Sequence, residues 1–191
     1  MNQSILLFFN GFVHRSAVLD GLGIFLIQWS LFIVPLVVLA TYALGLLRGQ
    51  ARWRTVAVQT GVFMVICVAL GELLGLLVHE PRPLFVVPGI RILLTHANDS
   101  SFPSGHTLLC FSAALGLYAL NKKCGVAMTV FALLVGLAKI FAAHHYPLDI
   151  VGTIIFVSAL FLLYRAFAAK WVTKGYRELE RRLLPARFRE S

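Results

Sequence analysis

Five long stretches of the chain contain no charged residue, and this feature constrains the fold more than any other. With its flanks, each stretch is long enough for a helix that crosses a lipid bilayer. The stretches are Gly21–Leu47, Thr55–Gly71, Thr107–Asn121, Cys124–Ala138 and Ile150–Tyr164. A hydrophobic content of 59% and a charged content of 13% are far from the composition of soluble globular proteins. We therefore expect an all-α, polytopic membrane helix bundle that forms a single domain over residues 1–191.

The segment before and within the first stretch leaves two arrangements open. We expect the apolar segment Ile5–Phe12 to form an amino-terminal interfacial helix, and if it also crosses the membrane the count of spans is six instead of five. Pro35 makes the first stretch compatible with one long span or with a short re-entrant helix followed by a span. A cleaved signal peptide is not expected, because no basic segment precedes the first apolar residues.

Basic residues are concentrated in alternate connections between the spans. The net charge is +9, and thirteen of the seventeen Lys and Arg residues follow the first, third and fifth stretches. These thirteen are Arg48, Arg52, Arg54, Lys122, Lys123, Arg165, Lys170, Lys174, Arg177, Arg181, Arg182, Arg187 and Arg189. Because cytoplasmic loops are enriched in Lys and Arg, the connections that carry these thirteen residues should lie in the cytoplasm. Residues 79–106 and 139–149 should then lie on the opposite side of the membrane.

This distribution predicts a multi-pass protein of the inner (plasma) membrane with an extracytoplasmic site. Residues 170–191 are expected to form a basic cytoplasmic tail. A basic segment next to a membrane binds anionic lipid headgroups, so we expect membrane lipids and not nucleic acid as its partner.

Polar side chains gather at the end of the bundle assigned to the outside. All six histidines fall there, with the four remaining basic residues Arg15, Arg82, Arg91 and Lys139. Ionisable groups near membrane depth are by default a functional-site hypothesis. His14, His79 and His144 are expected to be ordinary solvated side chains. The other groups fall mainly in three patches where a loop meets a span, at residues 80–83, 103–106 and 145–149.

The second patch, Pro103-Ser104-Gly105-His106, has the features of an anion site. Proline favours the first position of a helix, which would leave the N–H groups of Ser104, Gly105 and His106 unpaired. Such N–H groups, with the positive end of the helix dipole, bind phosphate. An ordinary helix start with an incidental histidine is an equally good interpretation of this patch alone.

The third patch, His145-Tyr146-Pro147-Leu148-Asp149, predicts a histidine nucleophile. Pro147 marks a helix start, which leaves His145 in the loop and Asp149 in the first helical turn. A carboxylate that accepts a hydrogen bond from one imidazole nitrogen leaves the other free to attack. The alternative is that Asp149 only complements the helix dipole.

Cations for a phosphate group are available nearby. Arg82 is held between two prolines and can bind phosphate oxygens bidentately. Lys139 either points into the phosphate site or pairs with Glu72, the only acid inside the second span. Phosphoryl transfer without a metal needs such positive charge. The cysteines at 67, 110 and 124 have no metal-ligand spacing, and we expect neither a metal nor another cofactor.

These patches resemble the signature of the type-2 phosphatidic acid phosphatase superfamily, K-x6-R-P, then P-S-G-H, then S-R-x5-H-x3-D. The surrounding sequence is most similar to bacterial undecaprenyl-diphosphate phosphatases of the bacitracin-resistance type. The resemblance implies hydrolysis of a polyprenyl diphosphate or another lipid phosphate, in lipid carrier recycling for cell wall peptidoglycan. It also implies that His145 attacks phosphorus with support from Asp149, and that His106 protonates the leaving group. The phosphate would be held by Arg82, Lys139, Ser104 and Gly105.

The chain departs from that signature at three positions. The motif lysine falls at Gly75, the motif serine at Ala138 and the motif arginine at Lys139. Arg91 is our candidate for the missing lysine, as a further phosphate ligand. The apolar segment Leu84–Leu94 is expected to form an interfacial flap against the lipid tail.

Two other functions fit the same residues. A lipid phosphotransferase would use this site but pass the phosphoryl group to an acceptor other than water. A non-enzymatic membrane transport subunit would instead bind a metal through its outer histidines.

Overall fold

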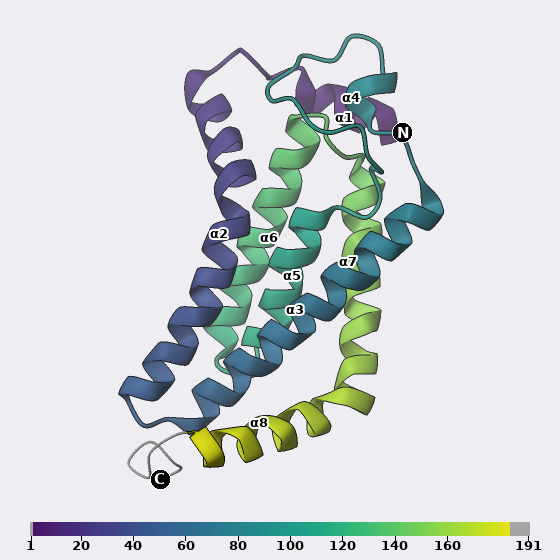
Figure 1. The fold of residues 1–191 in the computed structure, drawn as a ribbon. Helices are drawn as coiled ribbons and strands as arrows, with labels where there is room; N and C mark the ends of the chain where they lie inside the picture. Colours follow the sequence, from purple (N-terminus) through teal and green to yellow (C-terminus); the bar gives the residue numbers. More distant parts are fainter. Residues whose placement is uncertain (1, 184–191) are drawn as a thin grey trace.

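The computed structural model describes residues 2–183, which form a helical bundle without a β-strand in that range (Figure 1). The helices are α1 (Asn2–Asn10), α2 (Ala17–Leu47), α3 (Ala51–Val78), α4 (Pro83–Val86), α5 (Gly105–Leu117), α6 (Lys122–Phe141), α7 (Pro147–Leu163) and α8 (Ala169–Leu183), with a π-helical turn, η1 (Tyr164–Ala168), between the last two. The expected all-α, polytopic membrane bundle is confirmed.

Each of the five charge-free stretches lies largely in one helix. The helices α2, α3, α6 and the continuous segment Pro147–Leu183 are long and apolar enough to cross a membrane, and α5 is a shorter apolar helix. The nine residues of α1 give a helix of about 14 Å, too short to cross the hydrocarbon core. The structure therefore does not support α1 as a sixth span, and α2 continues through Pro35 without a break.

Large apolar side chains form an exposed stripe on α2. Phe25, Trp29, Phe32, Leu36 and Leu39 recur at helical spacing, and their exposed fractions run from 47% to 69%. An exposed stripe of this size would be unfavourable in water but is suited to lipid. This face of α2 is therefore expected to contact the acyl chains of the bilayer.

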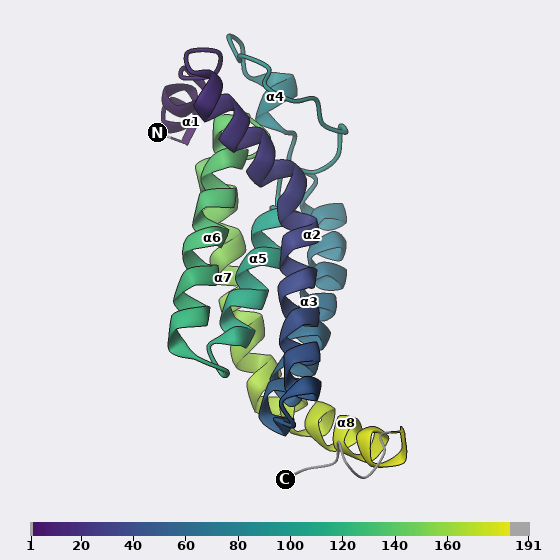
Figure 2. The same ribbon diagram turned by 90° about the vertical axis from the view of Figure 1, so that its left-hand side faces the viewer.

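The short helix α5 lies at the centre of the bundle. It packs against α2, α3, α6 and α7 (Figure 2), and Ala113, Ala114 and Leu117 on it are almost fully buried. The tilted helix α3 approaches it closely at Gly71, where a Cβ atom would overlap the Leu108 side chain. This packing places the first residues of α5 in the middle of the bundle, beneath the loops.

At the other end of the bundle, α8 turns away from α7 and crosses beneath the helices (Figure 1). A buried ion pair holds it there, in which Arg54 Nε of α3 donates to Glu180 Oε1 of α8 at 2.5 Å. The α2–α3 and α5–α6 connections lie at this same end, so the basic segments expected in the cytoplasm share one end of the bundle. Residues 184–191 of the expected tail lie outside the described residues.

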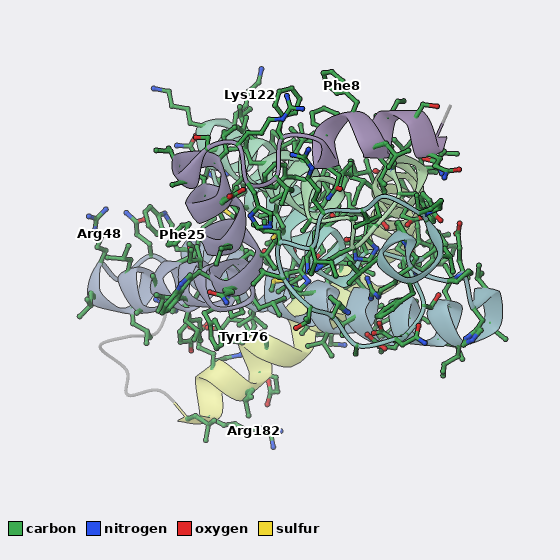
Figure 3. The ribbon with its side chains drawn as sticks, turned by 90° about the horizontal axis from the view of Figure 1, so that it is seen from above. Phe8, Phe25, Arg48, Lys122, Tyr176 and Arg182 are labelled. Carbon is green, nitrogen blue, oxygen red and sulfur yellow. The ribbon has the colours of Figure 1, made fainter. Side chains whose placement is uncertain are left out.

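The loop between α4 and α5 lies over the opposite end of the bundle and is fixed by α1 (Figure 3). The buried Asn10 side chain accepts a hydrogen bond from the Arg91 amide at 2.8 Å and donates to the Arg91 and Phe141 carbonyls at 2.9 and 3.0 Å. Phe8 on α1 points away from the bundle. The segment Leu84–Leu94, expected to act as a flap, is thereby tied to α1 and to the end of α6.

Candidate active site

A cavity of about 560 Å³ opens at the loop end of the bundle. Its polar lining includes Arg82, His96, Asp99, His106 and His145, so residues from all three sequence patches meet there. Its apolar lining comes from the spans and consists of Leu31, Val68, Leu76, Leu108 and Leu109. The cavity thus joins Arg82, a group of histidines and the acids Glu72 and Asp99 to an apolar wall.

His145 lies in the loop before α7, as expected from Pro147, and its side chain is almost fully buried. Its Nδ1 is 2.5 Å from the Ser101 carbonyl oxygen, which can only accept, so Nδ1 carries the proton. Its Nε2 lies 3.0 Å from Arg82 Nη1, a donor, and therefore presents its lone pair. Burial lowers the pKa of His145 well below its usual 6.5, and the charges of Arg82 and Lys139 lower it further. The ring is neutral at neutral pH.

Asp149 lies in the first turn of α7, as expected, but does not accept a hydrogen bond from His145. Its Oδ2 is 3.8 Å from His145 Nδ1 and instead accepts from the Ser101 hydroxyl at 2.5 Å and the Tyr146 amide at 2.7 Å. Ser101 thus bridges the two side chains, because its carbonyl accepts a hydrogen bond from the His145 ring and its hydroxyl donates one to the Asp149 carboxylate. Burial raises the pKa of the Glu80 carboxyl, which also hydrogen-bonds to Asp149.

Arg82 is the cation in contact with His145. Its Nη1 donates to the His144 carbonyl at 2.9 Å and faces His145 Nε2, and its Nε donates to Asp99 Oδ1 at 2.6 Å. Partial burial alone would raise the pKa of Asp99, but the hydrogen bond and charge of Arg82 bring it below the usual 3.8. Asp99 is therefore a carboxylate near neutral pH.

His106 and Lys139 flank this group. His106 lines the cavity, and its Nε2 lies 3.1 Å from the Ile27 carbonyl, so in the neutral ring Nε2 carries the proton and Nδ1 has a lone pair. Lys139 is 1% exposed and lies within electrostatic range of Arg82 and Asp99, but behind the cavity lining. Among the described residues its ammonium group has no ion pair with Glu72, which lines the cavity.

The Pro-Ser-Gly-His segment differs from expectation at its start. The helix α5 begins at Gly105, with Ser104 as the preceding cap residue, and not at Pro103. The Ser104 amide is occupied, because it donates to Thr153 Oγ1 at 2.9 Å, and the Ser104 hydroxyl donates to Thr107 Oγ1 at 3.1 Å. Gly105 lines the cavity, and a Cβ there would meet open space. The N–H donors for an anion therefore start at Gly105, one residue later than the sequence suggested.

Two further expectations need correction. The structure does not bring Arg91 to the cavity, because its Nη1 donates to the Gly11 and Val13 carbonyls at 3.2 and 3.1 Å, which hold it against the segment after α1. His144 is buried and not solvated, and burial lowers its pKa to about 4. Its ring contacts the His96 ring edge-on, with centroids 4.8 Å apart.

Ser101, Asp99 and His96 were missed by the sequence analysis although they contribute to the site. Ser101 directly precedes Phe102 and the Pro-Ser-Gly-His segment, so its proximity to that segment was available as a signal. Asp99 and His96 lie in the irregular loop after α4, where no periodicity indicates the direction of a side chain. Within residues 2–183, no group of three or more His, Cys, Asp or Glu side chains is arranged to hold a metal ion.

Comparisons with known proteins show related sequences and a related fold. The undecaprenyl-diphosphatase BcrC of Bacillus subtilis (strain 168) is 30% identical over 168 residues, which cover 88% of this chain and 84% of the relative. A Bacillus licheniformis protein named bacitracin transport permease protein BcrC is 27% identical over 196 residues, covering 100% of this chain and 95% of the relative. The crystal structure of Aquifex aeolicus LpxE matches with a TM-score of 0.65 at 18% identity, over 87% of this chain and 95% of that one, so the fold is shared.

Residues 56–172, which contain Arg82, the Pro-Ser-Gly-His segment, His145 and Asp149, match the PAP2 superfamily. The chain belongs to the PAP2 superfamily. Within that superfamily it is a membrane lipid phosphatase.

Proposed function

We propose that the protein hydrolyses undecaprenyl diphosphate, or a closely similar polyprenyl diphosphate, to the lipid monophosphate and inorganic phosphate. The observation that carries the proposal is the buried, neutral His145, whose Nε2 lone pair lies beside Arg82 at the wall of the cavity. The relative named undecaprenyl-diphosphatase and the apolar wall next to the polar cluster support a lipid diphosphate as substrate.

The residues suggest a reaction in two displacements. His145 Nε2 attacks the terminal phosphorus and the bond from phosphorus to the bridging oxygen breaks. His106, protonated on both ring nitrogens beside the anionic diphosphate, gives its Nδ1 proton to the departing lipid phosphate. Water then attacks the phosphohistidine, His106 accepts its proton, and the P–N bond breaks to release phosphate. Arg82 and the first N–H groups of α5 stabilise the charge on the transferred phosphoryl group. Lys139 adds positive charge from its position behind the cavity lining.

Asp149 and Ser101 are expected to hold the nucleophile in its reactive form. The Ser101 carbonyl fixes the proton on Nδ1, and the Asp149 carboxylate, 3.8 Å away, stabilises the positive charge that develops on the ring as phosphorus is attacked. The fixed tautomer directs Nε2 and not Nδ1 at the substrate.

Phosphate release by the purified protein in detergent, with EDTA present, tests the proposed function. Given a panel of lipid mono- and diphosphates and no added acceptor, the protein is expected to release phosphate fastest from the polyprenyl diphosphate. A preparation of His145→Asn serves as the blank for contaminating phosphatases. Release only when an alcohol or sugar acceptor is supplied would instead identify a phosphotransferase, and no release from any lipid would contradict both.

We also propose that the cavity faces the outside of the cell membrane, as the distribution of basic residues predicts. Thr95 lies exposed in the loop at the cavity end, and a cysteine there should react with a membrane-impermeant thiol reagent in intact cells. The variant is made with Cys67, Cys110 and Cys124 replaced.

Cys124 provides the matched control for this labelling. It is exposed at the start of α6, at the opposite end of the bundle. In a chain that keeps Cys124 as its only cysteine, labelling should require lysis. The reverse pattern, with Cys124 labelled in intact cells and the cysteine at position 95 labelled only after lysis, would place the cavity in the cytoplasm.

A further inference from the structure

The side chain that pairs with Arg82 in the cavity is an acid. Asp99 Oδ1 accepts a hydrogen bond from Arg82 Nε at 2.6 Å. The Arg82 side chain is 6% exposed, whereas that of Asp99 is 58% exposed. Asp99 also lines the same cavity as His106 and His145. A carboxylate therefore already lies against the guanidinium group that the proposed reaction uses for phosphate.

The substrate phosphate must come close to the same guanidinium group. Attack requires phosphorus to lie about 3–3.5 Å from the nucleophile, and His145 Nε2 is itself only 3.0 Å from Arg82 Nη1. The oxygens of the transferred phosphoryl group will then contact Arg82. Two parallel N–H donors give the strongest binding of phosphate to arginine. Arg82 is now held by three groups, which are the buried His144 carbonyl, the buried His145 ring and the Asp99 carboxylate, and only Asp99 is exposed.

We propose that Asp99 is an internal anion that competes with the substrate phosphate for Arg82 and is displaced when substrate binds. The inference rests on the proposed function, since it takes Arg82 as a phosphate ligand. Inorganic phosphate and a lipid monophosphate have few other contacts with which to offset the loss of the Arg82–Asp99 ion pair. A lipid diphosphate has a second phosphate and a tail along the apolar wall, so it can bind in spite of this cost, whereas the cost keeps the binding of inorganic phosphate weak.

The same contact has an opposite interpretation, in which Asp99 orients Arg82 and strengthens phosphate binding. The two interpretations predict opposite signs for one measurement, the inhibition constant of inorganic phosphate in the hydrolysis of lipid diphosphate. In Asp99→Asn the side chain keeps its shape but loses its charge. If Asp99 competes, the inhibition constant should fall about five- to tenfold, because the charge-assisted hydrogen bond that phosphate must break becomes a neutral one of about half the strength.

Glu72→Gln is the matched control for the loss of one negative charge from the cavity. Glu72 lines the same cavity, but among the described residues it makes no ion pair with Arg82. Its replacement should lower the phosphate inhibition constant clearly less than Asp99→Asn does. A rise in the constant in Asp99→Asn, or an equal fall in both variants, would overturn the proposal.

Failure of this inference can be told from failure of the proposed function. If the unmodified protein releases no phosphate from lipid diphosphates, the proposed function fails. If it does release phosphate, and the inhibition constant in Asp99→Asn is unchanged or raised, hydrolysis stands and only the role of Asp99 is rejected.

Discussion

Replacing His145 by asparagine is expected to lower kcat by about 10⁴-fold or more, which is the scale of loss when a nucleophile is removed. An asparagine amide can donate to the Ser101 carbonyl in place of His145 Nδ1, so the loop before α7 should keep its conformation. The variant should therefore extract and purify like the unmodified protein and unfold at a similar temperature. Phosphate release from the lipid diphosphate is the measurement.

The neighbouring histidine is the matched control for this variant. His144 holds Arg82 through its backbone carbonyl, which remains in His144→Ala, while its side chain bonds to the Leu94 carbonyl. We expect His144→Ala to unfold at a lower temperature but to retain turnover. Turnover retained in His145→Asn and lost in a folded His144→Ala would show that the nucleophile has been assigned to the wrong residue.

Replacing Lys139 by methionine is expected to lower kcat by about 10²- to 10³-fold, as when one group that stabilises transition-state charge is removed. Lys139 is buried, and among the described residues its ammonium group has neither a hydrogen bond nor an ion pair, so its charge is available to the phosphoryl group. Because that charge acts mainly on the transition state, the loss should appear in kcat more than in KM. Lys139→Arg, which restores the residue of the family signature, should retain substantial activity.

The double variant Lys139→Met with Glu72→Gln tests the alternative that these residues form a structural ion pair. If they did, removing both charges would restore stability and turnover, because no unpaired carboxylate would remain at membrane depth. The absence of such a pair in the structure leads us to expect that turnover stays low in the double variant. Recovery of both properties would reject Lys139 as a group that acts on phosphate.

The sequence predicts the helices and the local position of each proposed catalytic group well, because both depend on short-range rules. Charge-free stretches define the spans, and Pro147 places His145 in a loop and Asp149 in the next helical turn. The signature also associates Arg82 with these groups, and the structure brings its guanidinium group to 3.0 Å from His145 Nε2.

The contacts between these groups could not be predicted, because they depend on the irregular loop after α4. Ser101 reaches both His145 and Asp149 only because that loop folds back over the bundle, and Asp99 reaches Arg82 in the same way. Arg91 was assigned to the phosphate by its charge and loop position. Its actual contacts, with Asn10 and the segment after α1, join residues about eighty positions apart, which no local pattern reveals.

The ion pair between α3 and α8 at the other end of the bundle could not be predicted from the sequence either. The sequence analysis assigned Arg54 to the cytoplasmic side by its charge and could not show that it is buried in an ion pair with Glu180. That pair forms because the chain changes direction at the π-helical turn η1, so that α8 lies beneath α3. The apolar residues of α7, which precede η1, do not indicate this change of direction.

The stereochemical course at phosphorus tests the central claim, that His145 is phosphorylated before water attacks. The substrate is a polyprenyl diphosphate whose terminal group is a chiral, oxygen-isotope-labelled thiophosphoryl group, hydrolysed in water of a third oxygen isotope. Two successive in-line displacements, the first by His145 Nε2 and the second by water, each invert phosphorus, so the account predicts net retention of configuration. Net inversion in the released thiophosphate would show that water attacks the substrate directly and would contradict the account.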